Sequence, residues 1–152
     1  MSTFFDDLLG RFNELHADIV KAVDGLSSEA LDWVPGPEMS SINMLVVHLT
    51  GAERYWIGDV ALGDPSDRDR DKEFLAHGLS AFELKERLSA ADGYARVALG
   101  SFSLPDPEAD RKSPRNQKTF RVGWCLTHAL EHSALHLGQI QLTRQLWDQK
   151  KS

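Results

Sequence analysis

Three histidines at a regular spacing lie close to the C-terminal end of the chain. His128, His132 and His136 fall in the segment HALEHSALHLGQ, residues 128–139, and make up half of the six histidines. On an α-helix, steps of four residues advance ~400° and rise about 6 Å, so the three rings share one stripe. Imidazoles at i and i+4 can bind one metal ion, whereas those at i and i+8 lie roughly 12 Å apart. One ion therefore takes His132 with either His128 or His136, and the spacing does not decide between them.

A third ligand must come from elsewhere in the chain, and His48 is the best candidate. It lies within the largely apolar segment INMLVVHLTGAERYW, residues 42–56. A buried neutral imidazole needs partners for its ring nitrogens. A metal ion would be such a partner, but a carboxylate or a carbonyl satisfies a core histidine equally well. The residues alone leave both interpretations open.

Four segments have apolar residues at steps of three and four, which is typical of amphipathic helices. We expect helices over residues 4–23, 41–63, 80–99 and 121–147. Ser80 and Glu83 have the spacing of a capping box, which favours a helix start at this point. Gly63 and Gly100 are expected ends. Four helices, each with one apolar face, bury those faces most economically against one another, so the sequence predicts an all-α four-helix bundle.

The connections between these helices differ in length. Residues 26–41 contain Pro35, Gly36 and Pro37 and form a connector with one short turn. Residues 63–72, GDPSDRDRDK, are expected to be a solvated loop, and residues 101–119 a long loop with room for a small hairpin. The two long loops can serve as crossovers. We expect a single domain over residues 1–152.

Composition excludes several classes of protein. Hydrophobic residues make up 41% and charged residues 26%, which is ordinary for a globular protein. The net charge of −6, with a pI near 5.4, argues against a nucleic-acid partner, because no basic stripe is available for phosphates. The apolar runs are too short for a membrane span, and no signal pattern is present, so a cytoplasmic location is expected. Cys125 is the single cysteine, and a buried structural role is expected for it.

The two histidine segments, taken together, resemble the DinB-like family of small bundles, also called the DinB/YfiT superfamily. VVHLTGAERYW is followed, roughly eighty residues later, by HALEHSALHLGQI, and the similarity also covers LDWVPGPEMSSINMLVVHL. The resemblance implies a four-helix bundle of up-down-down-up topology with a divalent metal ion held by three histidines. Those positions are His48, His132 and His136 in this sequence. The HxGQ ending selects His136, and His128 is then a residue that lines the pocket.

Three histidine ligands leave a divalent ion with its full charge and an open position, where water or a thiol ionises near neutral pH. Some members of the DinB-like family are S-transferases or isomerases that depend on low-molecular-weight thiols. The resemblance therefore implies a metal-dependent enzyme that activates a thiol for attack on an electrophile. Two alternatives are a non-catalytic metal-binding or stress-response bundle with a structural ion, and a metal-dependent hydrolase.

Further roles follow from position relative to the ligands. We expect His128 to act as the catalytic proton acceptor, and Tyr55 and Gln139 to bind the cofactor or orient water, since they lie one or two turns from the ligands. Zinc or nickel is expected at the metal site, with iron or copper as alternatives. A small-molecule substrate and a homodimer are expected. His16 and His77 have no partner at ligand spacing and are expected at the surface or at its boundary with the core.

Overall fold

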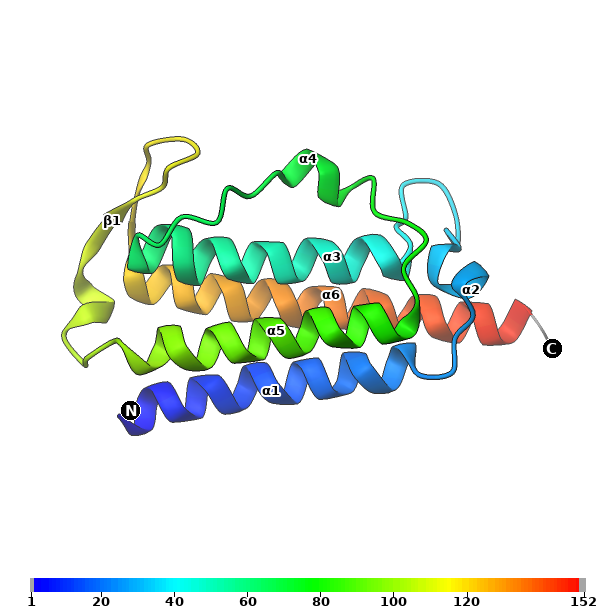
Figure 1. Cartoon of the computed structure of the whole chain (residues 1–152), viewed down its shortest axis with the longest axis horizontal. Helices are drawn as coiled ribbons and strands as arrows, with labels where there is room; N and C mark the ends of the chain where they lie inside the picture. Colours follow the sequence, from blue (N-terminus) through cyan, green and yellow to red (C-terminus); the bar gives the residue numbers. More distant parts are fainter. Residues whose placement is uncertain (1, 151–152) are drawn as a thin grey trace.

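The computed structural model describes residues 2–150, and four long helical units dominate it (Figure 1). The long units are α1 (Thr3–Val23), α3 (Ile42–Glu53) with its π-helical continuation η1 (Arg54–Leu62), α5 (Ala81–Gly100) and α6 (Val122–Lys150). The short elements are α2 (Ser28–Asp32), α4 (Arg70–Glu73), the 3₁₀ turn η2 (Asp106–Glu108), β1 (Asp110–Lys112) and β2 (Thr119–Arg121). The predicted helices are confirmed to within a few residues.

The topology is up-down-down-up. Helices α1 and α6 run in one direction, and α3 and α5 run in the opposite direction (Figure 1). Both α1 and α3 pack against α5 and α6. Because α3 and α5 are parallel, residues 63–80 return along the length of the bundle between them; we call this crossover the strap. The strap carries α4, which packs on α3.

Helix starts are fixed by serine caps. The Ser41 side chain accepts a hydrogen bond from the backbone N–H of Met44 at 3.2 Å. Ser80 and Glu83 form the expected capping box, in which Glu83 accepts from the Ser80 backbone at 2.8 Å and the Ser80 hydroxyl accepts from the Glu83 backbone at 3.3 Å. Such caps satisfy backbone donors that the first helical turn leaves free. Gly63 ends η1 with a φ of 73°, a conformation that favours glycine.

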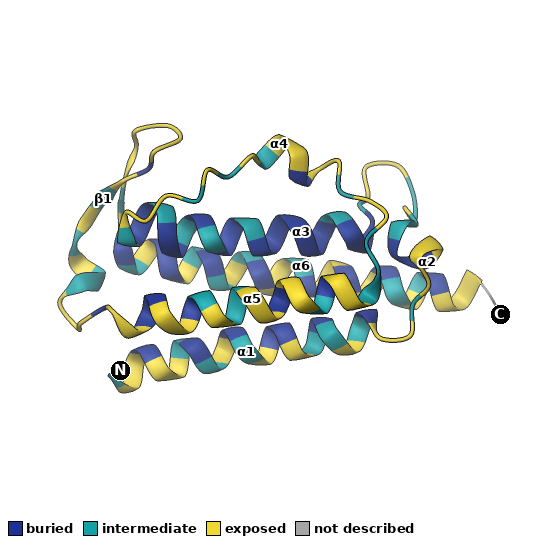
Figure 2. Ribbon diagram, in the orientation of Figure 1, coloured by how far each residue is buried: buried dark blue, intermediate teal, exposed yellow. Residues whose placement is uncertain are grey.

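The core is the space between the four helices. Buried side chains line their inner faces, and α3 is buried along almost its whole length (Figure 2). Cys125 is a free, fully buried thiol in this core, and burial raises its pKa to about 11. A thiol in that state is inert, as the structural role requires. None of the described helices is both long and apolar enough to cross a membrane.

The predicted hairpin lies at the start of α6. Strands β1 and β2 pair antiparallel, with Asp110 opposite Arg121, and α6 begins at the next residue. The hairpin thus joins the end of α5 to α6 at one end of the bundle (Figure 1).

Two expectations were wrong. The segment of residues 63–72 is not simply a solvated loop, because Arg68 pairs with the buried Glu73, which in turn bonds His48 of α3. His16 is neither at the surface nor at its boundary: it is 1% exposed, and its ring nitrogens donate hydrogen bonds to the carboxylates of Glu53 and Asp92. In both cases ion pairs permit the burial of charged groups, which an apolar spacing pattern does not reveal. His77 is exposed, as expected.

Candidate metal centre

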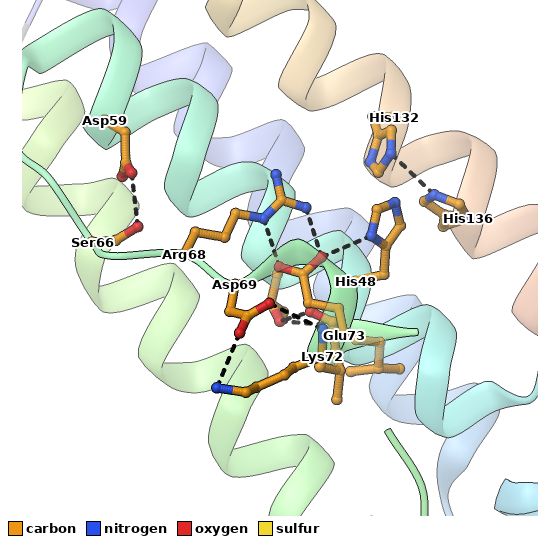
Figure 3. Close-up of polar contacts among 12 residues, drawn as sticks. His48, Asp59, Ser66, Arg68, Asp69, Lys72, Glu73, His132 and His136 are labelled. Carbon is orange, nitrogen blue, oxygen red and sulfur yellow. Dashed lines mark hydrogen bonds and ion pairs between the residues drawn. The ribbon is translucent and has the colours of Figure 1, made fainter. Parts of the chain in front are cut away.

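Three of the six histidines converge where α3 packs on α6. One ring nitrogen each from His48, His132 and His136 lies within 4.8 Å of the other two. His48 is buried on α3, while His132 and His136 are half-buried on α6 (Figure 3). No other histidine, cysteine or carboxylate among residues 2–150 belongs to this cluster.

The structure distinguishes between the two possible pairs on α6. The Nε2 atoms of His132 and His136 are 3.1 Å apart, and both rings lie 5.0–5.2 Å from the ring of His48, measured between centroids. The ring of His128 lies 5.9 Å from that of His132 and outside the cluster. The three histidines that the resemblance selects are therefore those that the fold brings together.

Two acceptors fix the orientation of the candidate ligand rings. Nδ1 of His48 donates to Oε2 of Glu73 at 2.9 Å, and Nδ1 of His136 donates to Oε1 of Gln139 at 2.6 Å. A proton on Nδ1 leaves the Nε2 atom of each ring with a free lone pair for a metal. Gln139, expected to bind the cofactor, is thus placed to orient a ligand.

The electrostatics keep two of these rings neutral. Burial, followed by the neighbouring His136 and His48 rings, lowers the pKa of His132 to about 3. Burial also lowers the pKa of His136, against the opposing hydrogen bond to Gln139. Neutral imidazole is the form that binds a metal. The Nε2 atoms of His132 and His136 are 3.1 Å apart. A proton or a cation is needed between them, because two lone pairs at this distance would repel each other. The donor set therefore fits a divalent ion.

Glu73, which accepts a hydrogen bond from His48, is itself held by Arg68, another residue of the strap. Arg68 donates to both carboxylate oxygens of Glu73, from Nε at 2.6 Å and from the guanidinium Nη2 at 2.7 Å (Figure 3). Burial raises the pKa of Glu73, but Arg68 and His48 outweigh it and leave that pKa below its usual value. A Cβ atom at position 51 would lie 2.1 Å from Oε1 of Glu73, so Gly51 is what lets the carboxylate approach α3.

The sequence did not indicate the Arg68–Glu73 pair. Glu53 and Glu131 are the acidic residues nearest the candidate ligands in sequence, but each lies beside a different histidine. Oε1 of Glu53 lies 2.9 Å from Nε2 of the buried His16, and Glu131 lies 3.8 Å from His128. A glycine three residues after His48 was the one available sign that something packs closely there.

An aromatic surface extends from the histidine cluster toward the hairpin. It consists of Trp56, Phe120, Trp124 and the ring of His128. His128 stacks on Trp124 with centroids 4.7 Å apart and 14° between planes, and Phe120 stacks on Trp124 at 4.7 Å. Trp56 makes T-shaped contacts with Trp124 and His128, with ring centroids 5.1 and 5.0 Å apart. Trp124 is 46% exposed, so an apolar face is open to solvent beside the cluster.

Tyr55 lies under this surface. It is buried, its ring packs edge-on against Trp56 at 5.2 Å, and its hydroxyl shares a 2.6 Å hydrogen bond with Ser113. Its hydroxyl thus faces the loop of the hairpin, while the Arg68 guanidinium lies over its ring, 5.5 Å from the centroid.

The bundle topology, with a histidine cluster between α3 and α6, defines a DinB-like protein. Residues 7–149 match the family model described as mycothiol-S-transferase, and the chain belongs to that family. No curated protein matches the sequence.

Two solved structures share the fold. YfiT from Bacillus subtilis, described as a probable metal-dependent hydrolase with an unusual four-helix bundle topology, is 14% identical with a TM-score of 0.70, over 94% of this chain and 87% of YfiT. A histidine-to-alanine mutant of the mycothiol-dependent maleylpyruvate isomerase is 12% identical with a TM-score of 0.65. That match covers 92% of this chain but only 63% of the isomerase, which is less than two thirds of its length.

Proposed function

We propose that this protein is a metal-dependent S-transferase that uses a low-molecular-weight thiol, mycothiol, as the nucleophile toward an electrophilic small molecule. The observation that carries the proposal is the convergence of three imidazole nitrogens within 4.8 Å, with no fourth protein ligand among the described residues. Structural metal sites are closed by four protein ligands, whereas catalytic sites keep a position open. Membership of the mycothiol-S-transferase family supports the choice of thiol.

In this proposal, His48, His132 and His136 hold the ion, and Glu73 and Gln139 hold two of those rings in place. A divalent ion with three neutral ligands supplies Lewis acidity, which lowers the pKa of a thiol or water molecule beside it. Imidazole ligands suit zinc or nickel, with iron and copper as alternatives.

His128 is proposed to accept the thiol proton. It is half-buried, lies one turn before His132 on the same face of α6, and stacks on Trp124, which holds its ring in place. The sulfur then forms a bond to the electrophilic carbon, and the leaving group departs with its bonding electrons. The proton on His128 passes to the leaving group or to water, so the reaction balances.

The aromatic surface is proposed to bind the apolar part of the electrophile. The exposed part of Trp124 and the neighbouring Trp56 offer apolar contacts directly beside His128. Tyr55 is proposed to support this surface from below through Trp56. An electrophile held there lies next to both the proton acceptor and the histidine cluster.

Two alternatives predict different behaviour. A structural ion would stabilise the fold without any turnover, and it would bind the same three histidines. A hydrolase would use the same ligands with water in place of the thiol; YfiT is described as a probable metal-dependent hydrolase.

The test is conjugation of mycothiol to an alkyl halide by metal-loaded protein purified without a histidine tag. We expect thiol-dependent conjugation that is lost in His136→Ala and retained in His77→Ala, a matched change at an exposed histidine outside the cluster. Ester hydrolysis that proceeds without any thiol, with conjugation at the uncatalysed rate, would favour the hydrolase instead.

The remaining proposals concern assembly and location. We propose that residues 1–152 form a single domain. We also propose that the protein is a homodimer, which light scattering can check. The proposed location is the cytoplasm, where thiols stay reduced.

A further inference from the structure

Arg68 has hydrogen-bond donors that its ion pair with Glu73 does not use. A guanidinium group carries five N–H bonds in one plane. Nε and Nη2 of Arg68 donate to the two oxygens of Glu73, at 2.6 and 2.7 Å. The third nitrogen, Nη1, has no hydrogen-bond partner among residues 2–150, although the side chain is only 11% exposed. Nη1 can still be reached from outside, because it is not among the described buried atoms that lack a partner.

The guanidinium group lies beside the histidine cluster. Nη2 of Arg68 and Nδ1 of His48 donate to the same oxygen of Glu73, at 2.7 and 2.9 Å. On the other side, the guanidinium carbon is 5.5 Å from the centroid of the Tyr55 ring. Burial is the main cause of the low pKa of His132, and the positive charge of Arg68 contributes to it. In Figure 3 the nitrogen without a dashed line lies on the side away from Glu73 and toward the helix that carries His132.

The charges at this site favour an anionic ligand. Glu73 compensates the charge of Arg68, and it is the carboxylate that bonds His48. Three neutral imidazoles would leave the full charge of a divalent ion without a counterion. An anion beside the ion would supply that counterion, and Nη1 offers it N–H donors in the planar arrangement that suits carboxylate oxygens.

We propose that Arg68 selects the electrophile in the thiol transfer, by donating from Nη1 to a carboxylate carried next to the reactive carbon. This inference rests on the proposed function and adds the class of its second substrate, an anionic electrophile such as a 2-halo carboxylate. Arg68 is a binding residue in this proposal and stays protonated throughout, since its pKa is far above neutrality.

The transfer to a 2-halo carboxylate balances without any further reactant. The thiol proton passes to His128, the sulfur forms a bond to the carbon that bears the halogen, and the carbon–halogen bond breaks. The halide leaves with the bonding electrons, and the carboxylate is unchanged in the thioether product.

The test compares iodoacetate with iodoacetamide, which share the reactive carbon and leaving group and differ in charge. Each is conjugated to mycothiol by tag-free, metal-loaded protein, and kcat/KM is divided by the uncatalysed rate constant. We expect the parent protein to accelerate the reaction of iodoacetate about tenfold more than that of iodoacetamide, the order expected for a hydrogen bond between charged groups. Arg68→Gln should abolish this preference. Any loss of metal in the variant lowers both rates alike and cancels in their ratio.

Two further variants accompany the comparison. Arg96→Gln makes the same change of charge at an exposed arginine of α5 and should leave the preference intact. Arg68→Lys keeps a cation beside Glu73 and so protects the fold, but its one nitrogen must serve both Glu73 and the substrate. The preference should therefore fall in Arg68→Lys as well, which keeps the proposal testable if Arg68→Gln does not fold.

A binding measurement gives a readout that needs no turnover. Propanoate and propanamide are unreactive analogues of the two probes, and calorimetry on the metal-loaded parent should show propanoate binding about tenfold more tightly. Arg68→Gln should equalise the two affinities, whereas an undiminished preference for propanoate would show that the ion alone binds the carboxylate and would overturn the proposal.

The outcomes separate this inference from the proposed function. Conjugation of neither probe above the uncatalysed rate would refute the thiol transfer, and the calorimetry would then decide on Arg68 by itself. Catalysed conjugation with equal acceleration of both probes by the parent, or a full preference retained in Arg68→Gln or Arg68→Lys, would refute the role of Arg68 and leave the thiol transfer standing.

Discussion

Replacing Glu73 by glutamine should weaken metal binding although Glu73 is not one of the three clustered residues. Its carboxylate accepts a hydrogen bond from Nδ1 of His48 at 2.9 Å and two from Arg68 at 2.6 and 2.7 Å. An amide of the same shape has one oxygen, so it can accept from His48 or from Arg68 but cannot replace both carboxylate oxygens. Glu73→Gln therefore loosens the orientation of His48 and removes the negative charge behind it.

The magnitude follows from these contacts. Loss of a partner that holds a metal ligand typically costs about 10–100-fold in metal affinity. Because the amide still accepts one hydrogen bond, we expect the lower end, about tenfold, which is about 1.4 kcal/mol. The fold is destabilised as well, since Arg68 is 11% exposed and loses its counterion, at a cost of about 3 kcal/mol.

The assay is competition for zinc against a chelator of known affinity at neutral pH, with thermal unfolding of the metal-free protein measured in parallel. The control is Glu86→Gln on α5, an exposed glutamate with no ion pair among the described residues, which should change neither quantity. The pKa of Glu73 is lowered in the folded state, so its contribution to stability is present above its ordinary pKa of 4.5 and is lost as the pH falls below it. Glu73→Gln should flatten this acid dependence. Metal affinity equal to that of the parent protein would refute the proposed role of Glu73.

Four further substitutions test other parts of the structure. His128→Ala should keep the metal, as measured by elemental analysis, and lower kcat for conjugation about 10²–10⁴-fold, while an unchanged kcat would remove His128 from the mechanism. The raised pKa of His16 means that its stabilising contribution is complete below pH 6.5 and is lost as the pH rises toward about 10. His16→Leu should therefore cost about 3 kcal/mol near pH 6 and less at pH 10 in chemical denaturation, and an equal cost at both would contradict the charged state. Gly51→Ala should displace Glu73 and weaken zinc binding, whereas Gly93→Ala, with open space around it, should stabilise the helix by about 0.5–1 kcal/mol.

The bundle could be predicted from the sequence because its helices are local features. Apolar residues at steps of three and four define the buried faces, and a serine three residues before a glutamate defines a helix start. Ser80 and Glu83 form that box as expected. The direction of each helix came from the resemblance, since spacing along a helix carries no information about which helix it packs against.

The candidate site was predictable only in part. Spacing left His128 and His136 equally placed beside His132, and the resemblance made the choice. The partners of these rings were missed because they depend on contacts distant in sequence: Glu73 lies 25 residues from His48, and Asp92 lies 76 residues from His16. Charge patterning in residues 63–72 predicts a solvated loop and does not show that Arg68 pairs with the buried Glu73.

The position of Tyr55 illustrates a second limit. It lies seven residues after His48, so a regular α-helix would place both on one face. Tyr55 is the second residue of the π-helical segment Arg54–Leu62, which has a wider turn than an α-helix. Tyr55 lies in the core, with its hydroxyl on Ser113. Nothing in the apolar pattern indicates a π-helix at this point.

The most direct test of the central claim is the metal content of tag-free protein, measured by elemental analysis for the parent and for single alanine variants of the four histidines around the cluster. We expect one divalent ion per chain in the parent and in His128→Ala. Metal should be severely depleted in His48→Ala, His132→Ala and His136→Ala, because two histidines retain little of the affinity of three. Depletion in His128→Ala with retention in His136→Ala, or full occupancy in His48→Ala, would contradict the three-histidine site.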